Sequence, residues 1–139
     1  MEEPKQKAFS LWIAGSRADI TQWLQSQEIP LTEGNPMKGQ YIGFRDTYDR
    51  AVERHAQRMT RVYKMDFVKE DTWVLEIRLD SEAWVAMTTE KVFDIGWTTR
   101  LHYVSYSYSP YEWGVWYYHG KPFVLSAPGV YVFRPRGIA

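Results

Sequence analysis

Cysteine is absent from this 139-residue sequence, which therefore has no disulfide framework, no thiolate ligand for a metal and no cysteine nucleophile. Net charge is absent too, because 17 acidic side chains balance 17 basic ones. No global attraction draws such a chain to nucleic acid or to an anionic membrane surface, so we expect neither as a partner.

Long hydrophobic runs are also missing. No apolar stretch approaches the roughly 18 residues that indicate a membrane-spanning helix, and residues 1–7 lack the apolar centre of a signal peptide. Together with the lack of cysteine, these absences favour a soluble, cytoplasmic protein. The length suits one domain with its own core, and we expect a polar tail at residues 1–7 followed by a single domain at residues 8–139.

Hydrophobic spacing organises the N-terminal half into alternating strands and helices. Residues 8–14 form a short apolar run that is typical of a buried strand. Ser16 and Asp19 form a capping box, which predicts a short helix immediately after this strand. Residues 30–39 are rich in proline and glycine and are predicted to be a loop.

The rest of the chain carries one further long helix and mostly strands. A helix is expected at residues 47–64, capped by Asp46 or Thr47, and a short one begins at Asp80. Strands are predicted at residues 40–44, 73–79, 101–108, 114–118, 122–125 and 130–134. Helices early and strands late predict an α+β fold with a curved, mainly antiparallel sheet and two principal helices in the N-terminal half.

Aromatic side chains are abundant, at 17% of the chain, and more than half of them lie within residues 97–133. Strand alternation places His102, Val104, Tyr106 and Tyr108 on one face of the strand at 101–108. Such a tract can form the wall of a concave pocket, since pockets are mostly apolar with a few polar groups, or it can form an aromatic sheet core. The pocket interpretation predicts that Tyr106, Tyr108, Trp113 and Trp116 bind a substrate.

Three side chains in or near this tract could perform acid–base chemistry. Glu112 is a carboxylate surrounded by aromatic rings, an environment that would raise its pKa, and the alternative is a solvated turn residue. His102 and His119 lie on neighbouring predicted strands and could transfer or orient a proton. The histidines share no metal-ligand spacing, so we predict no metal site.

Arginines recur along the predicted second helix, at positions 50, 54, 58 and 61. A stripe of this kind can bind phosphates or an acidic partner, or it can be a solvated helix face. The sequence contains no G-x-S-x-G, G-x-G-x-x-G or H-E-x-x-H motif, so it gives no support for serine hydrolase, Rossmann or zincin chemistry.

Two N-terminal segments resemble the opening of ADP-ribosyltransferase-like domains. Leu11-Trp-Ile-Ala-Gly-Ser-Arg-Ala-Asp-Ile20 is similar to their first strand and helix, and Gly39-Gln-Tyr-Ile-Gly-Phe-Arg-Asp-Thr-Tyr-Asp-Arg-Ala51 resembles their second motif. The resemblance implies NAD as a substrate, Tyr41 stacked on nicotinamide and Glu112 as the acid that orients the ribose. The first strand has Ile13 and Ala14 where those enzymes use histidine or arginine, and Arg17 is the nearest basic residue.

Three functions are therefore expected as alternatives. The first is an enzyme of the ADP-ribosyl-transfer type that acts on NAD or a nucleotide-like ligand without a further cofactor. The second is a cofactor-free cyclase, isomerase or lyase with an aromatic pocket. The third is a non-catalytic interaction module, because exposed tyrosine and tryptophan favour interfaces. A small-molecule ligand is the expected partner, and the late apolar strands could also pair across a homodimer.

Overall fold

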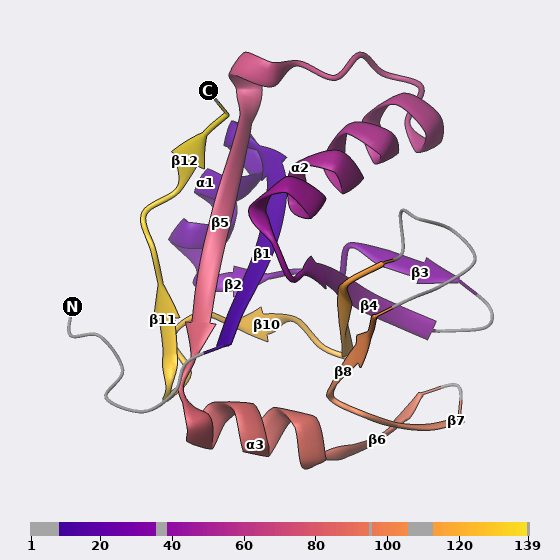
Figure 1. Cartoon of the computed structure of the whole chain (residues 1–139), viewed down its shortest axis with the longest axis vertical. Helices are drawn as coiled ribbons and strands as arrows, with labels where there is room; N and C mark the ends of the chain where they lie inside the picture. Colours follow the sequence, from indigo (N-terminus) through magenta and orange to yellow (C-terminus); the bar gives the residue numbers. More distant parts are fainter. Residues whose placement is uncertain (1–8, 36–38, 95, 106–112, 139) are drawn as a thin grey trace.

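A computed structural model describes residues 9–35, 39–94, 96–105 and 113–138 of the chain. Its elements in chain order are β1 (Phe9–Ser16), α1 (Arg17–Ser26), β2 (Glu28–Ile29), β3 (Glu33–Asn35), β4 (Gly39–Arg45), α2 (Tyr48–Gln57), β5 (Thr72–Leu79), α3 (Ser81–Thr89), β6 (Lys91–Asp94), β7 (Gly96–Thr99), β8 (Leu101–Val104), β9 (Val115–His119), β10 (Phe123–Val124), β11 (Val130–Val132) and β12 (Arg136–Gly137). The predicted α+β class with a mainly antiparallel sheet is confirmed (Figure 1).

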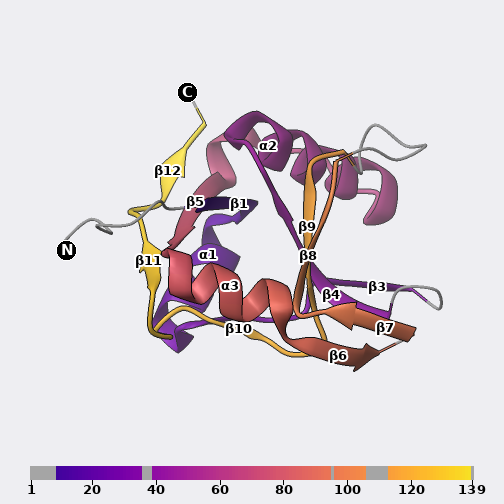
Figure 2. The ribbon, with the colours of Figure 1, turned by 60° about the horizontal axis from the view of Figure 1, so that its bottom comes forward.

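The main sheet has the strand order β11-β5-β1-β4-β9-β8, with β12 added beside β5 and β3 beside β4. β1 and β5 pair along their whole length, from Phe9 opposite Leu79 to Ser16 opposite Thr72. β1 and β4 share a single pair of residues, Trp12 and Arg45. The sheet therefore divides into two halves that separate beyond this pair, and Figures 1 and 2 show β4 running across the direction of β1.

The three helices of the described ranges begin where the sequence supplies a side-chain cap. The Oγ of Ser16 accepts a hydrogen bond from the Asp19 amide at 3.1 Å, as the capping box predicts. Thr47 caps α2 in the same way through the Arg50 amide, and Asp80 caps α3. These short polar side chains satisfy amides that have no partner inside the helix, so the helix starts could be predicted locally.

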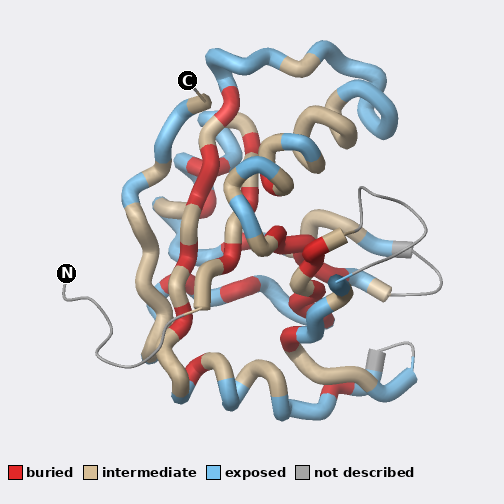
Figure 3. The backbone as a smooth tube through the Cα atoms, viewed as in Figure 1, coloured by how far each residue is buried: buried red, intermediate tan, exposed pale blue. Residues whose placement is uncertain are grey.

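The hydrophobic core lies between the sheet and the two helices α1 and α3 (Figure 3). β5 alternates as predicted: Leu75, Ile77 and Leu79 are buried on the core face, whereas Glu76 and Arg78 lie on the opposite face. On that opposite face, α2 packs against β1, where the Tyr48 ring meets the Trp12 ring edge-on at 6.1 Å. The sheet is thus covered by helices on both faces near β1 (Figure 2).

Residues 33–35 and 91–99 form strands that the sequence patterns did not predict. Residues 33–35, predicted to be a loop, form β3, because this segment turns back and pairs with β4 from Glu33 opposite Tyr41. Residues 91–99, for which no strands were predicted, form the hairpin β6–β7. The hairpin holds Phe93 and Trp97 about three-quarters exposed, with their rings 5.4 Å apart. Neither segment has the alternation of buried and polar residues on which a sequence prediction of a strand depends.

The predicted helix at residues 47–64 is confirmed only in its first part. The α-helix ends at Gln57, and one wider π-helical turn continues from Arg58 to Val62. Lys64 then adopts a left-handed backbone conformation with a φ of 55°. The change of helix type turns the chain back toward α2, which the periodicity of side chains alone does not reveal.

Candidate functional site

A cleft with a cavity volume of about 590 Å³ opens where β1 and β4 separate. Its walls are formed by residues 12–16 of β1, residues 30–33 before and within β3, Gly43 and Arg45 of β4, and one side of α2 with the turn that follows. The volume falls in the range of about 300–1,000 Å³ that is usual for small-molecule sites. The cleft therefore exists because the two halves of the sheet share only one residue pair.

Three arginines from three elements line this single cleft. Arg45 projects from β4, and Arg54 and Arg58 project from α2 and the first position of the π-helical turn. Arg45 is only 3% exposed, and this burial lowers the pKa of its guanidinium to about 10, so the group remains charged at neutral pH. Arg54 and Arg58 are partly buried and line the cleft, so these two arginines of the second helix do not lie on a fully solvated face.

Glu33 supplies the carboxylate that faces these arginines. It forms an ion pair with the Nη2 of Arg54, and the Nη1 of Arg54 bonds to Gln57 on its own helix. The side chain of Glu33 is 9% exposed, so the pair lies largely out of water, where each charge depends strongly on its partner. The Nε of Arg54 is buried and has no acceptor among the described residues.

Gly43 makes this close packing of charges possible. A β-carbon at this position would collide with the Oε2 of Glu33 and lie 3.1 Å from the Nη1 of Arg45. Because glycine has no β-carbon, Glu33 can lie over the strand backbone beside the arginine side chains. Gly43 therefore acts as a spacer in the floor of the cleft.

Arg58 connects the two sides of the cleft. Its Nη2 donates to the backbone oxygen of Thr32 at 2.9 Å, on the far wall, and to the hydroxyl of Tyr63 at 2.6 Å. The guanidinium also lies 5.4 Å from the centre of the Tyr63 ring, a cation–π distance. Among the residues that the structure describes, the Nε and Nη1 donors of Arg58 have no acceptor.

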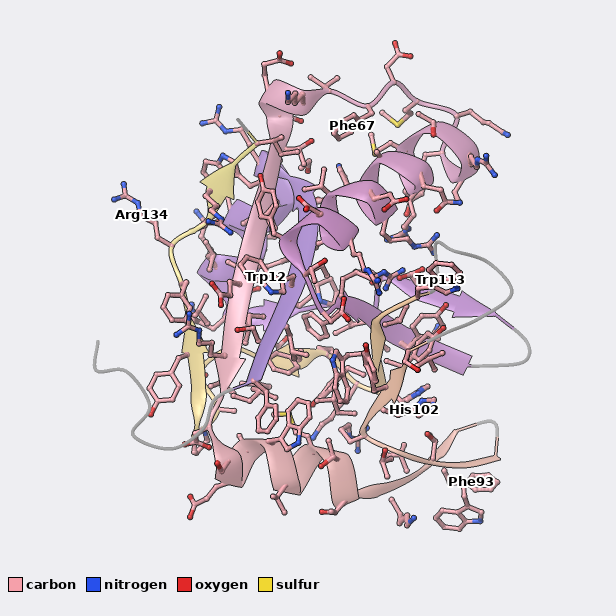
Figure 4. The ribbon with its side chains drawn as sticks, in the orientation of Figure 1. Trp12, Phe67, Phe93, His102, Trp113 and Arg134 are labelled. Atoms are coloured by element: carbon pink, nitrogen blue, oxygen red, sulfur yellow. The ribbon has the colours of Figure 1, made fainter. Side chains whose placement is uncertain are left out.

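His55 lines the same wall, one position after Arg54. Burial lowers the pKa of this imidazole, and the positive charge of Arg58 lowers it further, while Asp19 and Asp71 act in the opposite direction. The imidazole is consequently neutral at pH 7, and its ring packs edge-on against Phe67 at 6.0 Å. Figure 4 shows Phe67 by the segment that follows α2, and Trp12 by β1.

The remaining lining of the cleft is apolar. Ile13 and Leu31 contribute aliphatic surface, and the Trp23 ring lies so close to Gly15 that a β-carbon there would be 3.3 Å from its Cη2. Met59 and Met65 add flexible side chains near the opening. The cleft thus combines charged and apolar lining, which is the composition that ligand sites commonly have.

Several residues predicted from the aromatic tract come together on one sheet face, beside the cleft. Tyr41 meets the Tyr117 ring edge-on at 4.8 Å, and the ring centroids of His102 and His119 are 6.0 Å apart and stacked. His102 pairs with Tyr117 across β8 and β9, so both lie on this face. Figure 4 shows His102 on the β8 side of the molecule. Tyr41, Tyr117 and His119 are all buried, and none of these rings lines the cleft.

Other predicted site residues lie elsewhere. Trp116 is on the opposite face of β9, where its ring packs 4.5 Å from Trp84 of α3 and contacts the main core. Arg17 lies over the Trp73 ring at 4.9 Å, beside a second, shallower hollow that includes Arg134. Trp113 is half-buried just before β9 (Figure 4).

Three predicted residues, Glu112, Tyr106 and Tyr108, lie outside the described residues. Their assignment to a substrate pocket stays a prediction.

Sequence reasoning did not select Arg45 and Glu33, although it noted the arginines of the second helix. Arg45 ends an apolar strand, where a charged residue reads as a surface position, and Glu33 lies in a segment that was predicted to be a loop. The available signal for this site was Gly43 followed two positions later by Arg45. A glycine inside a strand often marks a place where another group approaches the backbone closely.

No group of three or more histidine, aspartate or glutamate side chains among the described residues could hold a metal ion. Every helix in the part of the chain that the structure describes is too short or too polar to cross a bilayer. In comparisons with known proteins, no family model, no curated protein and no solved structure matches this chain.

Proposed function

We propose that the chain binds a small organic anion, of the size of a nucleotide, in the cleft between β1 and β4. The observation that carries this proposal is the convergence of Arg45, Arg54 and Arg58 on one cavity of about 590 Å³. Guanidinium groups present several donors in a fixed fork that matches a phosphate or a carboxylate.

NAD is the first ligand to test, because the resemblance to ADP-ribosyltransferase-like domains implies it. The cleft lies next to the segment that carries this resemblance, since Gly43 and Arg45 follow Tyr41 on the same face of β4. Tyr41 itself is covered by Tyr117, so a ring stacked on its face would require these two side chains to separate. The proposed reaction is transfer of the ADP-ribosyl group with release of nicotinamide.

Isothermal titration calorimetry with NAD, ADP-ribose and inorganic pyrophosphate tests the binding, and a nicotinamide assay tests the reaction. We expect at least one of these anions to bind, and Arg58→Gln to weaken its binding about tenfold, because a charge-assisted hydrogen bond contributes about 1.5–3 kcal/mol. Arg61→Gln is the matched control, since Arg61 is exposed and does not line the cleft. Absence of binding by all three ligands at millimolar concentration would refute the proposal.

A second candidate function rests on the stacked imidazoles of His102 and His119. Two histidine rings whose centroids are 6.0 Å apart, with Tyr41 and Tyr117 beside them, form a group that could transfer protons to an apolar substrate. Under this alternative, His119→Gln abolishes turnover of a substrate found by screening, whereas Arg58→Gln leaves it unchanged. The two variants thus distinguish catalysis at the face that carries His102 and His119 from catalysis in the cleft.

A further inference from the structure

Large apolar side chains gather in solvent beside the opening of the cleft. Val62, Tyr63, Met65 and Val68 are each about half exposed, at 57%, 52%, 58% and 48%. Single exposed apolar residues are ordinary, but a cluster within seven positions indicates a surface that something covers. Two of the four, Tyr63 and Met65, also line the cleft, so the cluster is continuous with the cavity.

The backbone holds these two side chains at the opening. The Tyr63 amide bonds to the Arg58 oxygen at 3.1 Å, and the Met65 amide bonds to the Met59 oxygen at 2.8 Å. The intervening π-helical turn and the left-handed Lys64 bend the chain back along α2. Single π-helical turns inside helices occur frequently at functional sites, because they redirect side chains at some cost in helix stability.

Arg58 joins the charged wall to this apolar opening. One end of its guanidinium reaches Thr32 across the cleft, and the same nitrogen binds the Tyr63 hydroxyl. The Tyr63 ring lies alongside the guanidinium, leaving a flat aromatic surface next to a positive charge. An occupant that fits both features has an anionic group and a flat apolar group a short distance apart.

We propose that Tyr63, Met65 and Met59 form a second subsite, which takes the aromatic ring of a ligand whose phosphate or carboxylate binds the arginines. This inference rests on the proposed anion-binding function and narrows its ligand class to aromatic phosphates or carboxylates, as in a nucleotide. The polarizable methionines adapt to a flat ring, and the tyrosine stacks on it. The part of the exposed cluster that lines the cleft, Tyr63 and Met65, is thus covered by the ring of the cleft's own ligand.

AMP and ribose 5-phosphate test the subsite as a matched pair, since they share the phosphate and the sugar and differ by the adenine ring. Calorimetry is expected to show AMP binding about tenfold more tightly, the gain typical of stacking one base on protein side chains. Met65→Ser should remove most of this preference while ribose 5-phosphate binds as before. Tyr63→Ala should also remove it, but with weaker binding of both ligands, because the Tyr63 hydroxyl and ring contact Arg58. Tyr63→Phe should keep it, because the ring remains.

Val68→Ser is the control, because Val68 is equally exposed but does not line the cleft, and its affinity for AMP should match that of the unaltered chain. Equal affinities for AMP and ribose 5-phosphate would overturn the subsite and leave the anion site standing. A preference for AMP that survives both Tyr63→Ala and Met65→Ser would also overturn it. Failure of both phosphates to bind would overturn the subsite, and it would overturn the anion site as well if NAD, ADP-ribose and pyrophosphate also fail to bind.

Discussion

The arginine cleft and the aromatic face of β9 are neighbours on β4, yet the first is open and the second is closed. On one strand face, Tyr41 packs against Tyr117, and two residues further Gly43 is followed by Arg45 at the cleft. Two large rings fill the space above the sheet, whereas a glycine beside a charged side chain leaves room. In this chain, therefore, the buried aromatic residues of β4 and β9 fill space by packing, whereas the buried charged residues line the cavity.

Removing a ring from the aromatic face should give the largest effect on stability. Tyr117 is 4% exposed and packs with Tyr41 and Val115, so Tyr117→Ala is expected to lower the free energy of unfolding by about 3 kcal/mol through cavity formation. Urea denaturation monitored by circular dichroism measures the loss. Tyr103→Ala, at a 37% exposed position, should cost about 1 kcal/mol or less. Similar costs at the two positions would mean that this face is not closed.

Removing the carboxylate of the cleft should change stability and affinity in opposite directions. Glu33→Ala leaves the Arg54 guanidinium without its ion-pair partner, and we expect a loss of about 2 kcal/mol in the free energy of unfolding, since the pair is largely buried. The same change removes a negative charge beside the proposed anion site, so the affinity for pyrophosphate should rise. Denaturation and calorimetry on one variant measure both. Glu53→Ala, exposed on α2, should change neither.

Filling the floor of the cleft should give a smaller effect. In Gly43→Ala, the new methyl group meets Glu33 and lies near the Nη1 of Arg45, so one of these charged side chains has to move. We expect a loss of about 1 kcal/mol in stability, together with weaker anion binding. Gly137→Ala is the control, because the nearest atom would be Trp73 Cδ1 at 3.9 Å, an ordinary contact. If anion affinity is unchanged in Gly43→Ala, the ligand does not bind next to Gly43.

The pH dependence of stability should show the smallest effect. Burial and Arg58 lower the pKa of His55 in the folded chain, so the unfolded chain binds a proton more readily. As the pH falls from the His55 pKa of the unfolded chain, near 6.5, toward the lower pKa of the folded chain, stability should therefore decrease. Above pH 6.5 the contribution of His55 to stability is fully present. Comparing melting temperatures at pH 7.5 and 5.5 for the unaltered chain and His55→Gln measures it. An equal decrease in both would show that His55 contributes nothing.

Much of the fold could be predicted because its signals are local. The starts of the helices follow from Ser16, Thr47 and Asp80, and the alternation of β5 shows which side chains face the core. His102 and His119 were expected on neighbouring strands, and their ring centroids lie 6.0 Å apart across β8 and β9. The candidate site was harder to predict from the sequence, because Glu33 and Arg45 lie in no pattern that distinguishes them from surface residues.

By itself, the sequence determined the α+β class, the helix caps, the faces of the strands and the arginine stripe of the second helix. Each of these depends on neighbours within a few positions, through capping hydrogen bonds or a fixed side-chain period. The tertiary structure alone decided that β1 and β4 share only the Trp12–Arg45 pair. That separation of the two sheet halves brings Glu33 to Arg54, 21 positions apart, and opens the cleft between them. Sheet pairing between distant strands has no local period, so no short segment of the chain encodes it.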